Sequence, residues 1–149
     1  MRLGIFARTF AGDEPAPIFG AVRAAGYPCT QYNFSCSGLA AMPDAVSPAV
    51  AEAVHAAAQA EGVDVVAVSG TYNMIHPDPA VRARGHQRLA VVAASARRLP
   101  TRLVTLCTGT RDPDDQWRRH PDNDRPGHAV AGAQNGYARP GQDVSGAPD

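Results

Sequence analysis

The fold class follows from residues 64–69, which read Asp-Val-Val-Ala-Val-Ser. An almost continuous apolar run of this length is typical of a strand covered on both faces, as the strands of parallel sheets are. Three other short segments are also predicted to be strands, namely residues 2–7, 29–34 and 102–107. We therefore expect four short strands, of which the third has the nearly all-apolar sequence of a strand covered on both faces.

Stretches with helical character separate these strands. In the middle one, apolar side chains recur at the spacing of three and four that places them on one helix face. They are Val46, Val50, Ala53, Val54 and Ala57. Ser47 followed by Pro48 fits the start of this helix, and Gly62 fits its end.

Two further helices are predicted on either side of it. The later one runs from about residue 79 to 99 and is ended by Pro100. Its inward-facing residues are expected to be Val81, Leu89, Val92, Ala96 and Leu99. The earlier one is shorter, lies near residues 17–25 and stops at Gly26.

The alternation of strand and helix predicts an α/β fold in which parallel strands are joined by right-handed crossovers. About four parallel β/α units fit into the chain. Its 149 residues fall short of the roughly 250 that a closed eight-unit barrel needs. Periodicity alone does not decide between an open sheet and part of a barrel.

The composition indicates a protein of a reducing compartment, and we expect the cytoplasm. Fourteen basic and fourteen acidic residues cancel, which argues against nucleic acid or a membrane surface as partner. Cys29, Cys36 and Cys107 are odd in number and lack CxxC pairing, so we expect small buried apolar residues instead of disulfides. No apolar run is long enough for a signal peptide or a membrane span.

The composition changes after about residue 123, and we divide the chain into residues 1–124 and 125–149. The second part is rich in Gly, Pro, Ala and Arg and has almost no bulky aliphatic side chains. One interpretation is a disordered tail, because such a segment buries too little apolar surface to offset its ordering entropy. The other is out-of-frame translation where a fifth β/α unit should begin.

Polar residues gather after the predicted strands, which is where chemistry sits in parallel α/β folds. Two His-Pro-Asp triplets, at His76 and His120, follow the third and fourth strands. Each imidazole is suited to bind a metal, move a proton or hydrogen-bond a sugar hydroxyl. The alternative is that Pro-Asp starts a helix and the His is a loop residue.

The segment after the fourth strand contains further candidates. Gly109 allows close approach of the backbone to a ligand, and Arg111 is suited to bind a carboxylate or phosphate. The alternative for Arg111 is an ion pair with Asp112 or Asp115. Trp117 is suited to stack on a sugar face or to cover the mouth of a barrel. Neither a phosphate loop nor GxGxxG is present, which disfavours nucleotide cofactors.

Several stretches resemble the sugar phosphate isomerase/epimerase family of xylose isomerase-like TIM barrels. They are LGIFARTF, QYNFS, SGTYNMIHPD, LVTLCTGTRDPDDQW and HPDND, within residues 2–124. The resemblance implies the N-terminal half of a (β/α)₈ barrel, thus a partial TIM barrel with a disordered C-terminal tail. It also implies a small sugar or hydroxy-carbonyl substrate, with a divalent metal (Mn, Mg, Co or Zn) and acid/base carboxylates that move a proton next to a carbonyl.

The resemblance also suggests site residues. His76 is the candidate catalytic residue. The candidate substrate-side residues are Asn73, Thr108, Gly109, Arg111, Trp117 and His120. The family's metal ligands come from later strands, so no metal ligand is assigned.

We therefore expect a truncated member of the family that is inactive and binds no metal on its own. Two alternatives stay open at this point. One is a metal-dependent endonuclease acting on abasic DNA, which shares this barrel. The other is a non-catalytic half barrel that dimerises and binds a small molecule, because a half barrel leaves an exposed strand edge and apolar surface.

Overall fold

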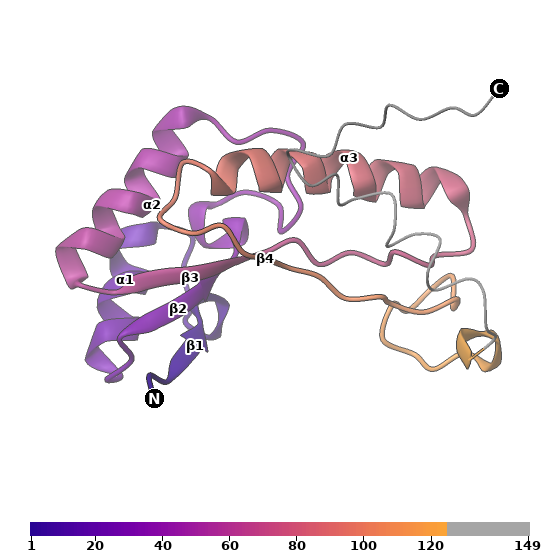
Figure 1. Cartoon of the computed structure of the whole chain (residues 1–149), viewed down its shortest axis with the longest axis horizontal. Helices are drawn as coiled ribbons and strands as arrows, with labels where there is room; N and C mark the ends of the chain where they lie inside the picture. Colours follow the sequence, from indigo (N-terminus) through magenta and orange to yellow (C-terminus); the bar gives the residue numbers. More distant parts are fainter. Residues whose placement is uncertain (125–149) are drawn as a thin grey trace, which may run out of the picture.

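The computed structural model describes residues 1–124 as an α/β unit of four strands and three α-helices (Figure 1). The strands are β1 (Gly4–Phe6), β2 (Cys29–Tyr32), β3 (Asp64–Ser69) and β4 (Val104–Thr105). They form one sheet in the order β1-β2-β3-β4, and every pair is parallel. The predicted α/β class and the four parallel units are confirmed. The predicted tail, residues 125–149, lies outside the described residues.

The three α-helices connect successive strands. They are α1 (Pro15–Ala24), α2 (Pro48–Glu61) and α3 (Pro79–Ala96). The predicted ends of α2 are confirmed, because the Ser47 hydroxyl accepts from the Val50 amide (3.3 Å) and Gly62 has a left-handed conformation. Short 3₁₀ helices follow β1 (Ala7–Thr9), β2 (Phe34–Ser37) and the β4 loop (Pro121–Asp124).

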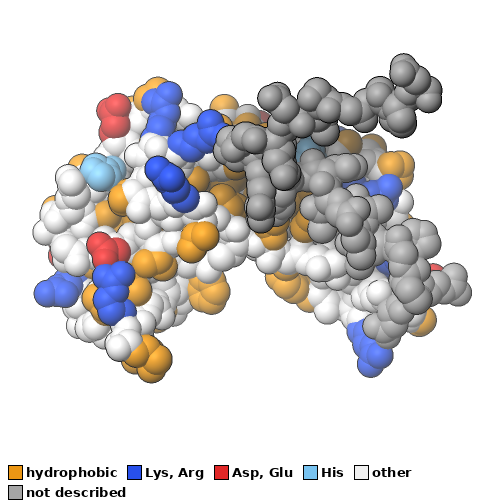
Figure 2. Space-filling model, in the orientation of Figure 1, with side chains coloured by type: hydrophobic (Ala, Val, Ile, Leu, Met, Phe, Trp, Pro, Cys, Tyr) orange, Lys and Arg blue, Asp and Glu red, His pale blue; other side chains and the backbone are white. Residues whose placement is uncertain are grey.

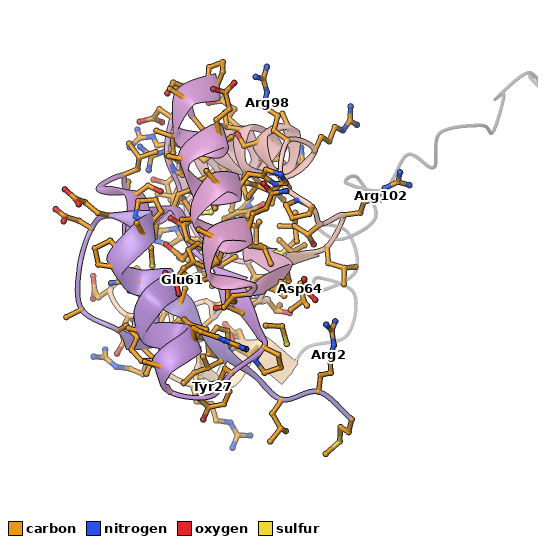
Figure 3. The ribbon with its side chains drawn as sticks, turned by 90° about the vertical axis from the view of Figure 1, so that its left-hand side faces the viewer. Arg2, Tyr27, Glu61, Asp64, Arg98 and Arg102 are labelled. Atoms are coloured by element: carbon orange, nitrogen blue, oxygen red, sulfur yellow. The ribbon has the colours of Figure 1, made fainter. Side chains whose placement is uncertain are left out.

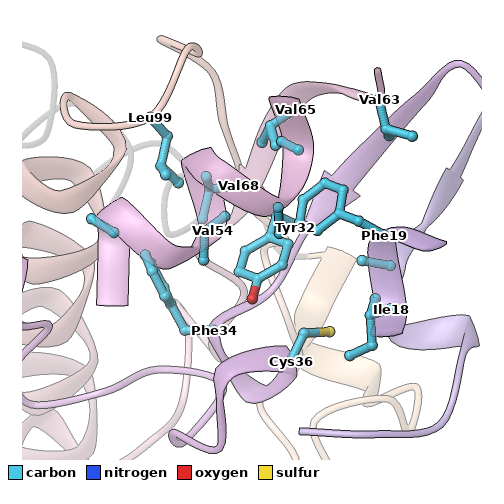
Figure 4. Close-up of a cluster of buried hydrophobic side chains, with 14 of the residues drawn as sticks. Ile18, Phe19, Tyr32, Phe34, Cys36, Val54, Val63, Val65, Val68 and Leu99 are labelled. Carbon is cyan, nitrogen blue, oxygen red and sulfur yellow. The ribbon is translucent and has the colours of Figure 1, made fainter. Parts of the chain in front are cut away.

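All three helices pack on one face of the sheet and bury a single core. At its centre the ring of Tyr32 stacks on Phe19 from α1, with centroids 5.7 Å apart, and meets Phe34 edge-on (Figure 4). Val54 from α2 and Val92 from α3 complete this core and are fully buried. Each of the three helices thus buries apolar side chains against the same face of the sheet.

The opposite face of the sheet, here called the open face, carries no helix among the described residues. Tyr32, Val68 and Val104 face the helix-covered core, and because side chains alternate along a strand, their neighbours point to the open face. These neighbours are Gln31, Ala67, Ser69, Leu103 and Thr105, and Phe6 joins them because it pairs with Gln31. Figure 2 shows hydrophobic side chains spread over the surface of the part that holds the strands.

Two details of the predicted core are wrong. Ala53 is exposed and Ala51 and Ala58 are buried instead, because α2 turns a slightly different face to the sheet. Val81 is 41% exposed, because the first turns of α3 run past the end of β3, beyond the sheet that covers Val92 and Ala96. The strands β1, β2 and β4 are also shorter than predicted, because only the residues that pair with a neighbouring strand belong to them.

The cysteines are not joined to one another. All three are free thiols, and the expected burial is confirmed for Cys29 and Cys36, whereas Cys107 is only partly buried. Burial raises the pKa of the thiols of Cys36 and Cys107, which keeps both protonated near neutral pH. Within residues 1–124, none of the helices combines the length and the apolar character that a membrane crossing requires.

Gly85 gives a prediction about how α3 is fixed to the loop after β3. A Cβ at Gly85 would lie 2.1 Å from Cδ2 and 2.9 Å from Cγ of Tyr72, so the ring lies directly on the helix backbone. Gly85→Ala is therefore expected to lower the free energy of unfolding by about 1–2 kcal/mol, although alanine normally favours a helix by about 1 kcal/mol. The measurement is urea unfolding followed by circular dichroism.

Gly20 in α1 is the matched control, because its Cβ would meet nothing nearer than the flexible Glu61 carboxylate at 3.8 Å. Gly20→Ala is expected to stabilise the protein by up to about 1 kcal/mol. If Gly85→Ala and Gly20→Ala changed the free energy of unfolding in the same direction, the packing of Tyr72 on α3 would be contradicted.

Candidate functional site

The loops that follow β3 and β4, residues 70–78 and 106–124, are joined into one unit, here called the rim (Figure 1). Asn73 makes the central link, since its Nδ2 donates to the carbonyl of Thr110 (2.7 Å) and its Oδ1 accepts from the Thr110 amide (3.1 Å). The amide of Met74 donates to the carbonyl of Thr108 (3.0 Å). Asn73 and Thr110 are buried, at 7% and 2% exposure. One side chain thus holds two loops together.

Asn123 closes the far end of the rim. Its Oδ1 accepts from the Arg111 amide (2.9 Å) and its Nδ2 donates to the hydroxyl of Thr110 (2.9 Å). The two ends of the segment 110–123 are therefore held together by hydrogen bonds. Sequence reasoning did not single out Asn123, and only its place in the HPDND stretch hinted at it.

Asp112 organises the turn between these contacts. Its Oδ1 accepts from the amides of Asp114 (3.0 Å) and Asp115 (2.9 Å), and its Oδ2 pairs with Arg118 (3.2 Å). The amide of Asp115, then that of Asp114, and the Arg118 guanidinium lower the pKa of Asp112 against the opposing effect of burial. The carboxylate is therefore a structural anion of the rim.

This shift predicts how the rim responds to acid. Because the pKa of Asp112 is lowered in the folded rim, its carboxylate stabilises the rim fully at any pH above the unfolded pKa of about 3.9. This stabilisation is lost as the pH falls through the folded-state pKa. Trp117 is the only tryptophan of the chain and lies in this loop, so its fluorescence anisotropy reports the rim alone. We expect the anisotropy to fall below about pH 4 in the natural protein.

Asp112→Asn is expected to have low anisotropy already at pH 7, with little change on acidification. Asp114→Asn is the control, because only the backbone amide of Asp114 takes part in the turn. If Asp112→Asn kept the acid transition of the natural protein, another carboxyl group would have to cause it.

His76, the predicted catalytic residue, lies in the rim with both ring nitrogens engaged. Nδ1 accepts from the Asp78 amide (3.0 Å), and Nε2 lies 3.2 Å from the carbonyl of Pro113. Because Nδ1 accepts a hydrogen bond, the contact with the Pro113 carbonyl requires a proton on Nε2. In this arrangement His76 ties the β3 loop to the β4 loop, and its catalytic role stays a prediction.

The second triplet repeats part of this geometry. His120 Nδ1 accepts from the Asp122 amide (3.2 Å), and a 3₁₀ helix begins at Pro121. In the first triplet Asp78 caps α3, with its carboxylate accepting from the Ala80 amide (2.7 Å). The alternative interpretation of His-Pro-Asp as a helix start is thus confirmed for both triplets, whereas substrate binding by His120 stays a prediction.

The remaining candidates lie on the outer part of the rim. Thr108 is exposed, and Gly109 has a positive φ of 80° that lets the chain pass close to Asn73. Arg111 is partly exposed, and among residues 1–124 it has no carboxylate partner, because Asp112 pairs with Arg118 instead. Trp117 is 70% exposed, so within the described residues it covers little of the barrel mouth.

A row of polar side chains on the open face, here called the polar row, was missed by sequence reasoning as a site. Gln31, Ser69 and Thr105 stand on three neighbouring strands near their carboxyl ends. The amide of Gln31 donates across β3 to the hydroxyl of Thr105 (2.6 Å). The signal was present in the strand alternation, since Gln31 precedes Tyr32 and must face the other way.

Comparison with known proteins fits this geometry. Residues 19–126, well over half of the chain, match the family described as xylose isomerase-like TIM barrel. The chain belongs to this family. Searches of curated proteins and of solved structures gave no match. Residues 1–124 accordingly provide four β/α units of a xylose isomerase-like barrel.

The metal that the family resemblance implies does not fit the described residues. Within residues 1–124, no three His, Cys, Asp or Glu side chains come close enough together to hold a metal ion. The carboxylate of Asp112 and both nitrogens of His76 are used within the rim itself. The open face contributes hydroxyl and amide groups at the carboxyl ends of its strands, and these are poor ligands for a tightly bound metal.

A cavity of about 400 Å³ lies between the rim and α3. Asn73, His76 and Asp112 line it from the rim, and Arg84 and Arg88 line it from α3. The guanidinium of Arg88 also forms a bidentate ion pair with Asp44 (2.7 and 3.0 Å). Of the predicted site residues, the cavity brings together Asn73 and His76, whereas Thr108, Gly109, Arg111, Trp117 and His120 lie outside it.

Proposed function

We propose that the rim and the polar row bind a sugar or hydroxy-carbonyl compound as the substrate-binding part of a sugar phosphate isomerase/epimerase. The polar row carries this proposal. It lies near the carboxyl ends of the strands, on the side that becomes the interior of the barrel, where barrel enzymes hold their substrates.

The chemistry of the polar row suits a polyhydroxylated ligand. Hydroxyl and amide groups donate and accept, as sugar hydroxyls do. After accepting from Gln31, the hydroxyl of Thr105 keeps its own proton to donate. The oxygen of the Gln31 amide also stays able to accept. Adjacent hydroxyls of a substrate therefore find complementary partners on two strands.

Arg111 and Trp117 supply the features that a phosphorylated sugar needs. A guanidinium with no carboxylate partner among residues 1–124 is suited to bind a phosphate or carboxylate bidentately. An indole ring that is 70% exposed offers a flat apolar surface for a sugar ring. Both belong to the loop that Asn73 and Asn123 hold in place.

Proton transfer next to the carbonyl needs groups that the described residues do not bring to the polar row. A divalent metal (Mn, Mg, Co or Zn) would polarise the carbonyl in the complete barrel. We propose that residues 1–124 bind and orient the substrate and do not catalyse by themselves. We further propose a cytoplasmic protein whose partner is a small molecule, not nucleic acid or membrane. The endonuclease alternative stays a prediction without an observation that favours it.

Thr105→Val tests the proposal at the polar row. The change keeps the shape of the side chain and removes its hydroxyl, and we expect about ten-fold weaker binding of D-fructose 6-phosphate or hydroxypyruvate. Binding is measured by saturation-transfer NMR on the full chain. Thr101→Val at the amino end is the control, because the Thr101 hydroxyl bonds only backbone groups (Val66 carbonyl, 2.8 Å; Leu103 amide, 3.2 Å).

Two further readouts separate the parts of the proposal. Arg111→Ala is expected to weaken binding of D-fructose 6-phosphate and to leave binding of D-fructose unchanged. Deuterium uptake next to the carbonyl in D₂O with Mn²⁺ is expected to stay at the background rate. Equal binding by the natural protein and Thr105→Val would remove the substrate-binding assignment, and rapid deuterium uptake would show that the chain catalyses.

A further inference from the structure

The sheet has two edges that no strand occupies among residues 1–124. β1 pairs only with β2, and β4 pairs only with β3. Each outer edge presents unpaired backbone donors and acceptors, which natural proteins cover, twist away or charge. Both edges run in the same direction, because all four strands are parallel.

Both edges also carry exposed apolar side chains. Leu3 (63% exposed) and Phe6 (59%) lie at β1, and Leu103 (65%) lies next to β4. Phe6 and Leu103 point to the open face, which becomes the interior of a closed barrel. At the amino ends of the strands, Figure 3 shows Arg2 beside Asp64, with which it forms an ion pair, and Arg102 further along the same side.

We propose that two copies of this chain close one eight-stranded barrel, with β4 of each copy paired in parallel with β1 of the other. A twofold axis along the barrel relates the copies. Four strands are half of the eight that a TIM barrel contains, and this pairing continues the order β1-β2-β3-β4 without a break. The inference does not depend on which ligand the rim binds.

The register of the sheet allows this closure. Beyond the irregularity at Thr30/Gln31, a row across the sheet joins Phe6 to Gln31 and Ala67, and the offset by which Val68 pairs with Val104 carries it to Leu103. Pairing Val104 with Leu3 of the second copy displaces this row by four residues and keeps paired side chains on the same face of the sheet. Two copies displace it by eight residues in all, which equals the shear of 8 of a TIM barrel.

Other twofold pairings leave strand edges uncovered. Pairing β1 with β1, or β4 with β4, is antiparallel and leaves the second edge of each copy free. Only the β4-to-β1 contact, made twice, leaves no edge and encloses Phe6 and Leu103. This contact also brings the rims of both copies together at the carboxyl end of the closed barrel. The strands of each copy then enclose the polar row of the other copy.

The first test is the mass of the full chain in solution. Sedimentation velocity at micromolar concentration is expected to give about twice the chain mass of 15.6 kDa. Leu103→Asp and Leu3→Asp are each expected to weaken the dimer about ten-fold or more, because a charge enters an apolar contact. Both sites are exposed, so circular dichroism is expected to stay unchanged. Val81→Asp, at an exposed apolar site on α3, is the matched control and is expected to stay dimeric.

The second test determines which edges meet. Leu3→Cys and Leu103→Cys are each placed in a Cys107→Ser background, in which the other cysteines are buried. With a short bismaleimide, the mixture is expected to cross-link residue 3 to residue 103, and each variant alone is expected to give no cross-linked dimer. A monomer at all concentrations, a dimer unaffected by both Asp variants, or cross-links formed by one variant alone would overturn the proposal.

Discussion

Gly109→Ala is expected to lower the free energy of unfolding by about 2–5 kcal/mol and to abolish ligand binding at the rim. Two costs add at this position. Gly109 has a φ of 80°, a region that L-residues enter at a cost of about 1–2 kcal/mol. A Cβ there would lie 2.2 Å from the Oδ1 and 2.8 Å from the Cα of Asn73. Because the second contact is with backbone, a side-chain rotation cannot relieve it.

Gly26→Ala separates the two costs. Gly26 has a similar φ of 87°, but a Cβ there meets nothing within 4 Å. We expect it to cost only about 1–2 kcal/mol and to leave ligand binding intact. Unfolding in urea and the anisotropy of Trp117 are measured for both variants. Equal losses in the two would show that the two loops do not approach as closely as the rim requires.

Asn73→Ala is expected to cost about 2–4 kcal/mol and to release the loop after β4 from the loop after β3. The change leaves both the amide and the carbonyl of Thr110 without the partners that they have in the buried rim. Hydrogen exchange is expected to accelerate at Thr110 and Arg111, while the core amides of β3 keep their protection.

Asn33→Ala is the matched control for this prediction. Asn33 also follows a strand, but its side chain accepts one hydrogen bond, from the Ser35 amide (2.9 Å). We expect it to cost about 1 kcal/mol and to leave exchange in the rim unchanged. A loss at Asn73 no larger than at Asn33 would mean that Asn73 is not the link between the loops.

The sequence predicted the fold well where local chemistry decides it. The apolar run of β3 and the Ser47-to-Gly62 limits of α2 depend on residues that are neighbours along the chain. The prediction failed at Val81, because its exposure depends on how far α3 extends past the sheet. Periodicity places a side chain on a helix face but does not say where the partner sheet ends.

The site was predicted only in part, for a similar reason. Candidate residues after β3 and β4 were found because parallel strands present their carboxyl ends together. Their distant partners were not found, since Nε2 of His76 and the side-chain amide of Asn73 contact residues 37 positions away. Gln31 was not assigned to the site, because its role depends on Thr105, which lies two strands from it.

The central claim is that the carboxyl-end rim and the polar row form the ligand-binding part of this barrel. Amide chemical shifts of the full chain, recorded with increasing D-fructose 6-phosphate, test it most directly. We expect shifts at residues 71–76, 105 and 108–111, with no change at Asp64 or Leu103 at the amino ends. Shifts confined to the amino ends, or no shifts at any concentration, would contradict the claim.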